Sequence, residues 1–414
     1  MNPLIERLYK KINKNRENLI KGFINSIPTP FKRFANDFIG FEESTYYLIT
    51  SFTKAGKSQL AYYLIWEALW YLYYHPNKGK TLKILAFPLE ETDVKVEARL
   101  ASWLLHKFTK GQCRISPKDL LSSNNDKPVP QEVLDIMNND EYIDLLDFYT
   151  NSMIFSDESN PTGIYKECKK YALKNGKVIK RKEIRVNIMG NEEYIDVFDH
   201  YEKDDPNEIV LTLVDTLNLL NSEKGYNKKQ TIDKMSEYGI FIRDTYLQSP
   251  LFIQQQNTSN ESIENFKYSR IRPTTSGLGD STNPARDANI TLSIFSPFKF
   301  GLKEYLGYSI DKFKDHFRTL EVLTNRDGEL GGIVPLLFDG AVCNWEELPY
   351  LTDTQGMANV YKKIGTMFFS AGYRCKKTFF KRLKNKIYRT IMFIQKCIII
   401  VIYSFKYIKI KRKK

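Results

Sequence analysis

The sequence has few of the residues that cross-link a chain or bind a soft metal. It contains five cysteines and four histidines among 414 residues, and no two cysteines form a Cys-x-x-Cys pair. Such a composition argues against a disulfide scaffold and against a zinc site. We therefore expect reduced thiols and a cytoplasmic protein.

Long apolar runs are also lacking. The first 26 residues have no uninterrupted apolar core of the kind found in a secretory signal. Residues 391–410 are rich in isoleucine, but Lys396, Lys406 and Lys409 interrupt them. The longest charge-free run there, Cys397–Phe405, is about half of the roughly 20 residues that a membrane span requires. We expect no integral membrane insertion.

Acidic residues are absent from the C-terminal end. From Gln355 onward there are 17 Lys and Arg and no Asp or Glu, although the formal net charge of the whole chain is only +13. The basicity therefore belongs to a tail, which we place at 351–414. A basic segment with interleaved Ile, Phe and Tyr is suited to nucleic-acid backbone or to an anionic membrane surface. A tail without any role is the simpler alternative.

The body of the chain alternates short apolar runs with helical stretches. Helices are expected at Lys57–Tyr74 and Thr92–Phe108. Runs typical of buried strands lie at 46–50, 82–87, 152–155, 209–215, 250–254, 289–295, 319–324 and 332–338. Such alternation predicts an α/β fold with a mostly parallel sheet and helices on both faces.

Three further segments define the predicted organisation. Residues 1–26 form an amphipathic helix, which either packs on its own domain or acts as a linker. Residues 175–206 alternate like a hairpin and are taken as a surface insertion in a domain spanning 27–350. Residues 257–288 are polar and rich in Asn, Ser, Thr, Gly and Pro, which predicts a long functional loop.

A phosphate-binding loop is predicted between the first long strand and the first long helix. Its residues are Ser51, Phe52, Thr53, Lys54, Ala55, Gly56, Lys57 and Ser58. In such a loop backbone N–H groups surround the phosphates, the lysine reaches the β and γ phosphates, and the hydroxyl binds Mg²⁺. Strand before and helix after are the context that this assignment needs. The first position is Ser51, where the usual pattern has glycine.

Carboxylates follow two other strands. The apolar run Ile209–Asp215 ends in an acid, which at the carboxyl end of a parallel strand can hold Mg²⁺ through water. A simple cap of the next segment is the alternative interpretation. Glu90 and Glu91 follow the strand at 82–87, and one of them is a candidate general base for the attacking water. Their alternative role is to complement the dipole of the next helix.

The order of these pieces resembles the motor domain of DnaB-type replicative helicases, a RecA-like fold. Pro88-Leu89-Glu90-Glu91 is similar to that family's Ser-Leu-Glu-Met, which assigns the catalytic glutamate to Glu90, with Arg99 on the next helix. The other matching segments are 155–159, 215–218, 253–257, 281–289, 324–328 and 336–339. The resemblance spans about residues 25–348. It implies that Gln255 senses the γ-phosphate and that Arg326 acts on the nucleotide of a neighbouring subunit, although a surface arginine in a turn is the alternative for Arg326.

The sequence also departs from the family pattern. Thr324 stands where the family has a lysine, so Arg326 alone is left, and slow hydrolysis is expected. Gly279 stands where the family carries an arginine near the DNA. Backbone amides and four basic residues are the predicted substitutes for phosphate contacts: Lys267, Arg270, Arg272 and Arg286. We expect no counterpart here of the family's separate N-terminal domain, which engages primase.

The sequence therefore predicts a RecA-like ATPase that uses ATP and Mg²⁺ and drives a DNA helicase in replication. Its expected partners are single-stranded DNA, other copies in a ring, taken as a hexamer, and a helicase loader or primase. A RecA-like recombinase and a non-hydrolysing loader or recombination mediator are the alternatives. Richness in Lys, Ile, Asn and Tyr suggests an AT-rich genome, such as that of a phage acting in the cytoplasm of its bacterial host.

Overall fold

The core of the molecule is one large sheet covered by helices. A computed structural model of the chain describes residues 3–123, 128–186, 192–257, 271–326, 328, 331–369 and 374–375. The sheet has nine strands in the order β16-β15-β14-β11-β3-β10-β9-β4-β6. Their bounds are β3 Tyr47–Ser51, β4 Thr81–Pro88, β6 Met153–Phe155, β9 Glu208–Asp215, β10 Ser249–Gln255, β11 Ile290–Phe295, β14 Phe317–Asn325, β15 Ile333–Asp339 and β16 Asn344–Glu347.

The sheet is parallel over most of its width. The six strands from β11 to β6 pair in parallel, and β14, β15 and β16 add antiparallel pairs beyond β11. The α/β class with a mostly parallel sheet is therefore confirmed. The antiparallel end was not predicted, because an apolar run shows that a strand is buried and does not show its direction.

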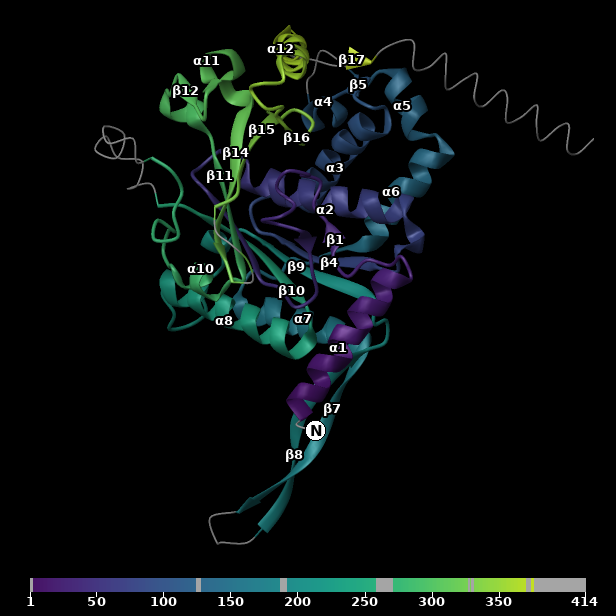
Figure 1. Ribbon diagram of the computed structural model, residues 1–414, viewed down its shortest axis with the longest axis vertical. Helices are drawn as coiled ribbons and strands as arrows, with labels where there is room; N and C mark the ends of the chain where they lie inside the picture. The colour runs from purple at the N-terminus through teal and green to yellow at the C-terminus, as the bar shows by residue number, and fades with distance from the viewer. Residues whose placement is uncertain are drawn as a thin grey trace, which may run out of the picture.

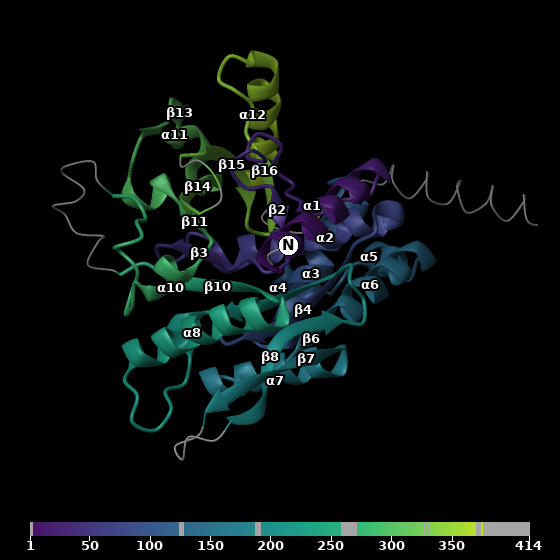
Figure 2. The same ribbon diagram turned by 60° about the horizontal axis from the view of Figure 1, so that its bottom comes forward.

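Helices cover both faces of the sheet (Figures 1 and 2). α2 (Lys57–Tyr74), α3 (Asp93–Phe108) and α6 (Asp140–Ser152) contribute to one apolar cluster. α7 (Pro161–Lys174) and α8 (Lys228–Tyr246) contribute to a second. Alternate residues of β3 serve the two clusters: Tyr47 and Ile49 belong to the first, Leu48 to the second. Burial on both faces explains why the strand is apolar at consecutive positions.

Short elements connect and extend this core. They are β1 Ile27–Pro28, β2 Gly40–Phe41, β5 Cys113–Arg114, α4 Pro117–Leu120, α5 Gln131–Met137, β12 Glu304–Tyr305, β13 Tyr308–Ser309, α11 Ile310–Phe313 and β17 Arg374–Cys375, with 3-10 turns at Pro76–Lys78, Leu217–Leu219, Pro297–Phe300 and Lys314–His316.

The predicted C-terminal tail begins as part of the folded body. α12 (Thr354–Phe369) packs Met357, Ile364 and Met367 into an apolar cluster with Phe313 and Phe317. Part of the predicted tail therefore packs on the folded body through an apolar face that the count of basic residues did not reveal. The rest of the predicted tail, from 376 onward, lies outside the described residues. Among the residues that the structure describes, no helix has the length and apolar character to span a membrane.

The N-terminal helix is present but exposes its apolar stripe. α1 covers Pro3–Ile20, and Ile5, Leu8 and Ile12 are 45%, 57% and 49% exposed. The interpretation that this stripe packs on the helix's own domain is therefore wrong. The linker interpretation stays a prediction.

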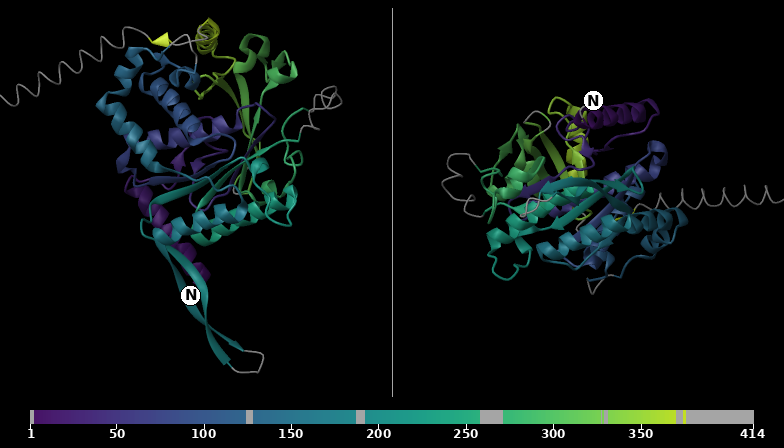
Figure 3. Two further views of the ribbon diagram at one scale, coloured as in Figure 1. Left: turned by 180° about the vertical axis from the view of Figure 1, so that it is seen from behind. Right: turned by 90° about the horizontal axis from the view of Figure 1, so that it is seen from below.

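The charged segment after α7 is a hairpin, as its alternation predicted. β7 (Gly176–Val186) pairs antiparallel with β8 (Glu192–Lys203), and the pair extends away from the body (Figure 3). The predicted loop at 257–288 is only partly a loop. Its end contains a short helix, α10 (Asn283–Asp287), which buries Pro284 and Ala285, and residues 258–270 lie outside the described residues.

Candidate nucleotide site

The candidate phosphate-binding loop has the predicted strand-loop-helix context. β3 ends at Ser51 and α2 begins at Lys57, so the loop wraps the N-terminus of a long helix. Gly56 has a φ of 103°, and a Cβ there would lie 3.1 Å from the Trp345 ring. Only glycine combines this conformation with so little space. The backbone N–H groups and the helix N-terminus together favour an anion.

A cavity of about 420 Å³, called the nucleotide cavity below because of the predicted role of its residues, opens beside this loop. That volume falls within the roughly 300–1,000 Å³ typical of small-molecule sites. Most of the predicted catalytic and phosphate-binding residues line it. The lining residues are Thr53, Lys54, Gly56, Lys57, Ser58, Gln59, Glu90, Glu91, Arg99, Asp215, Gln255, Asp315, Arg318, Phe338 and Gly340. Sheet register explains this grouping, because Gln255 pairs with Ser51 and Pro88 pairs with Asp215 at neighbouring strand ends.

The two predicted magnesium ligands are in contact. The Ser58 hydroxyl donates a hydrogen bond of 2.8 Å to Asp215 Oδ1. Burial raises the pKa of Asp215 to about 6; the Ser58 hydrogen bond opposes that rise, and the charge of Glu90 adds to it. The carboxylates of Asp215 and Glu90 lie at the same cavity, so a positive charge would be stabilised there. A hydroxyl and a carboxylate oxygen are ligands that fit a hard divalent cation such as Mg²⁺.

Asp215→Asn is expected to stabilise the nucleotide-free protein at pH 8. The folded-state pKa lies above the ordinary 3.8, so the folded chain holds this proton more tightly, and ionisation costs stability as pH rises through about 6. Asn removes that cost and keeps an oxygen for Ser58. The gain should reach up to about 3 kcal/mol at pH 8 and shrink towards zero near pH 4.

Urea unfolding across this pH range measures the effect. Asp135→Asn, at an exposed position on α5, is the matched control and should change stability little. A destabilised Asp215→Asn chain at pH 8 would contradict the assigned burial cost.

The two adjacent glutamates differ in their surroundings. Glu91 forms an ion pair with Arg99, whose side chain is only 12% exposed. Arg99 Nη1 is buried without a hydrogen-bond partner among the described residues. Glu90 is exposed to the cavity, and no ion pair involves it in the described part of the chain. Glu91 is thus committed to Arg99, whereas the carboxylate of Glu90 is available to a bound molecule.

Gln255 connects the phosphate-binding loop to Asn218. Its Nε2 donates to Thr53 Oγ1 at 2.6 Å, and its backbone N–H donates to Asn218 Oδ1 at 2.8 Å. Asn218 Nδ2 then donates to Asp280 Oδ2 at 2.9 Å. A continuous hydrogen-bonded path therefore joins the phosphate-binding loop to the segment near Gly279. The role of Asn218 was missed, because its two partners are distant in the sequence.

Arg326 lies away from this cavity. It lines a separate cavity of about 570 Å³ together with Arg286 and Thr324, and its guanidinium donates to the Arg286 backbone carbonyl. Within one chain it cannot belong to the nucleotide site. Arg272 is exposed. Burial raises the pKa of Tyr305 and of Glu321, and the positive charge of Arg272 partly opposes both rises. Lys267 and Arg270 lie outside the described residues.

Arg318 lines the nucleotide cavity and was not predicted. Its side chain is 1% exposed, and its Nε donates to the Ala55 carbonyl in the phosphate-binding loop at 2.9 Å. A further hydrogen bond of 2.9 Å joins it to Asp315, and its guanidinium lies 5.0 Å from the Phe338 ring centroid. Burial lowers its pKa. This arginine brings a fixed positive charge to the underside of the loop.

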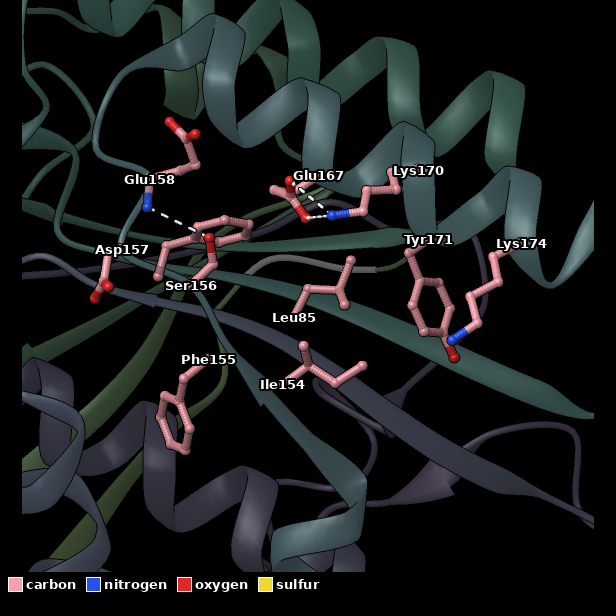
Figure 4. A pocket seen from close by; sticks show the side chains of 11 residues that line it. Leu85, Ile154, Phe155, Ser156, Asp157, Glu158, Glu167, Lys170, Tyr171 and Lys174 are labelled. Carbon is pink, nitrogen blue, oxygen red and sulfur yellow. Dashed lines mark hydrogen bonds and ion pairs between the residues drawn. The ribbon is translucent and has the colours of Figure 1, made fainter.

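A further cavity, of about 560 Å³, lies at the β6 edge of the sheet (Figure 4). Leu85, Ile154 and Phe155 contribute apolar surface to it, and Lys170 of α7 contributes to its charged part. None of its lining residues belongs to the nucleotide cavity. The segment at 155–159 therefore lies outside the nucleotide site, although the resemblance placed it among the family's motifs.

Sheet order and loop geometry together indicate a RecA-like fold. The structure is similar to the ATPase domain of G40P, with a TM-score of 0.58 and 15% identity over 84% of this chain and 100% of that chain. It is also similar to a DnaB-like replicative helicase whose structure was described with its interactions with primase, with a TM-score of 0.57 and 15% identity over 83% of this chain and 68% of that chain. No protein-family model and no curated protein matches the sequence. The likeness to DnaB-type motor domains is thus confirmed as a shared fold.

Proposed function

We propose that this chain is an ATP-dependent DNA helicase motor that acts in replication. Its substrate would be ATP with Mg²⁺, bound in the 420 Å³ cavity by the residues of the phosphate-binding loop. The observation that carries this proposal is the hydrogen-bonded path from Thr53 through Gln255 and Asn218 to Asp280. A motor must couple its nucleotide site to the surface that holds its track.

Each residue at the site would have a separate role. Lys57 and the loop N–H groups hold the phosphates, and Ser58 and Asp215 hold the cation, which neutralises charge on the phosphates when it is bound. Glu90 orients the attacking water and accepts its proton. Arg318 keeps the loop in place through Ala55, because its guanidinium is fixed by Asp315 and Phe338.

Single-stranded DNA would bind the segment that follows β10. The three consecutive glutamines of this region hold that segment. Gln254 donates to the carbonyls of Gly279 and Ser281, both at 2.7 Å, and Gln256 donates to the Thr274 carbonyl at 2.9 Å. The N–H of Gly279 is not available to a phosphate, because it donates to the Gln255 carbonyl. Side chains such as Arg272 and Arg286 would therefore make the phosphate contacts.

ATP hydrolysis with and without single-stranded DNA tests this function. A motor should hydrolyse ATP slowly alone and several-fold faster with DNA. The same chain should separate a forked duplex in an ATP-dependent manner. Hydrolysis that DNA does not change would contradict the motor assignment.

The second candidate is a recombinase or a loader or recombination mediator with the same fold. Thr324 favours it, since it stands where the resemblance expects a lysine and lines the cavity that contains Arg326 and Arg286. A mediator would bind nucleotide and DNA but show almost no turnover in this assay. The proposed partners of the motor are a ring of six copies and a helicase loader or primase, in the host-cell cytoplasm.

Arg326→Ala subunits mixed with wild type should depress hydrolysis more steeply than their mole fraction. The physical reason is that Arg326 lies outside its own chain's nucleotide cavity and would stabilise charge at a neighbour's site. Hydrolysis is measured across a mixing series. Lys118→Ala, at an exposed position on α4, should leave every mixture at wild-type activity. Loss strictly proportional to the mutant fraction would argue against a shared site.

A further inference from the structure

The hairpin of β7 and β8 has surface that no other described part of its chain covers. Only its base is anchored: the Tyr201 hydroxyl donates to the Ala172 carbonyl at 2.7 Å, and Tyr201 packs on Tyr246. Beyond the base the two strands project from the body as a two-stranded sheet (Figures 1 and 3). Among the described residues, no third strand pairs with either edge. Isolated two-stranded hairpins are marginal in water, and open edges invite pairing with another chain.

One face of the projecting part carries exposed apolar side chains among its charged ones. Ile184 lies directly opposite Tyr194, and their exposed fractions are 53% and 73%. Val186 lies two residues beyond Ile184, and Phe198 lies four residues beyond Tyr194; both are on the same face and are 66% and 46% exposed. The Lys182–Asp196 pair lies on that face between Tyr194 and Phe198. Four exposed large apolar side chains on a thin ribbon indicate a surface that another molecule covers.

The charges are separated by strand. β7 carries five basic residues and one acidic residue, Glu183, whereas β8 carries five acidic residues and one basic residue, Lys203. Within one hairpin this separation serves cross-strand pairs, such as Lys177 with Glu202 and Arg181 with Asp199. It also leaves a basic strand at one open edge and an acidic strand at the other.

Opposite charge on the two edges favours a second copy of this chain as the partner. Like charges that oppose one another across two strands disfavour pairing, whereas opposite charges favour it. Here the β7 edge of one copy attracts the β8 edge of the next. Copies related by rotation present these edges in antiparallel directions, which continues the ladder of the hairpin itself. The contact is head to tail, so it closes into a ring or extends into a filament.

Nucleic acid is a poorer fit to this surface. The described residues of the two strands carry six basic and six acidic side chains, so their formal charge is zero. Binding to a phosphate backbone depends on an excess of positive charge. Exposed apolar side chains among balanced charges fit a protein surface instead.

We propose that the β7–β8 hairpin is a self-association element, in which β7 of one copy adds to β8 of the next. The inference goes beyond ATP hydrolysis and does not depend on it. An inactive ATPase with intact hairpins would still associate.

Charge reversal on one strand at a time tests the proposal with the full chain. One variant carries Lys180→Glu and Lys182→Glu, and the other carries Glu192→Lys and Asp196→Lys. Each variant alone places like charges on adjoining edges, so its apparent dissociation constant should rise by about tenfold or more. Sedimentation velocity over a concentration series measures this constant. An equal mixture should recover wild-type association, because the acidic strands of one variant then meet the basic strands of the other.

Recovery in the mixture separates contact between copies from damage within a hairpin. A hairpin that had simply melted could not be restored by a second chain that carries the reversed charges on its other strand. The proposal is overturned if the wild-type chain is monomeric over this range, or if the mixture stays dissociated. It is equally overturned if the variants associate normally and lose only single-stranded DNA binding.

A cross-linking experiment locates the contact. Lys182→Cys and Asp196→Cys chains, each with Cys375 and Cys397 replaced by serine, are mixed and treated with a short bismaleimide. A covalent dimer should form in the mixture and should be weaker for either chain alone. Dimers that appear equally in the unmixed samples would contradict head-to-tail pairing.

Discussion

Replacing Lys57 by alanine should lower ATP turnover by at least about 100-fold and leave the fold intact. Lys57 is the first residue of α2, and its side chain lines the nucleotide cavity although the residue is only 8% exposed. The cavity also contains the carboxylates of Glu90, Asp215 and Asp315. Without the lysine, the negative charges of a nucleotide would meet these carboxylates with less compensation. Steady-state phosphate release by the full chain measures the loss.

A matched substitution separates this effect from general damage. Lys78→Ala removes a lysine from the turn just after α2, where its ammonium group donates to the Gly22 carbonyl in an exposed bond. It should leave turnover within about twofold of wild type. Circular dichroism and the urea midpoint should match for all three chains. Normal turnover by the Lys57→Ala chain would show that the loop does not bind the phosphates.

The elements of the fold were predictable where local pattern decides the structure. Strands buried on both faces must be apolar at consecutive positions, so β3, β4, β9 and β10 were located to within one or two residues. The hairpin was found because alternation along the sequence is a local signal. The order of the strands and the antiparallel end of the sheet were not predictable, because pairing partners leave no trace in a single sequence.

The motif residues of the site were predictable from the sequence, but the residues that hold them in place were not. Loop, carboxylates and Gln255 follow strand ends, and register then brings them together. Arg318 gives no such signal: its contact with Ala55 joins residues 263 positions apart. Asn218 belongs to the matching segment 215–218, but its hydrogen bond to Asp280 joins residues that are distant in the sequence. Residues that hold a motif in place, such as Arg318 and Asn218, can be found only from a structure, because each looks like an ordinary surface position in the sequence.

The Glu90→Gln chain is expected to bind nucleotide and hydrolyse it roughly 10²–10⁴-fold more slowly. Glu90 lies at the cavity, and no ion pair occupies it among the described residues, so its carboxylate can accept a proton from water. Glutamine keeps the size and removes the base. A second consequence follows from the charge of Glu90, which helps to raise the pKa of Asp215. Removing that charge should lower the Asp215 pKa and leave cation binding intact.

Glu91→Gln is the matched control, since it changes the neighbouring carboxylate by the same chemistry. Glu91 is engaged with Arg99, so the base is unaffected and turnover should fall by less than about tenfold. Nucleotide affinity is measured with a fluorescent ATP analogue, and turnover by phosphate release, for both chains. Strong loss in Glu91→Gln with near-normal Glu90→Gln would move the base by one residue. Such a shift would place the base on the carboxylate that forms an ion pair with Arg99, and the roles of both acids would have to be exchanged.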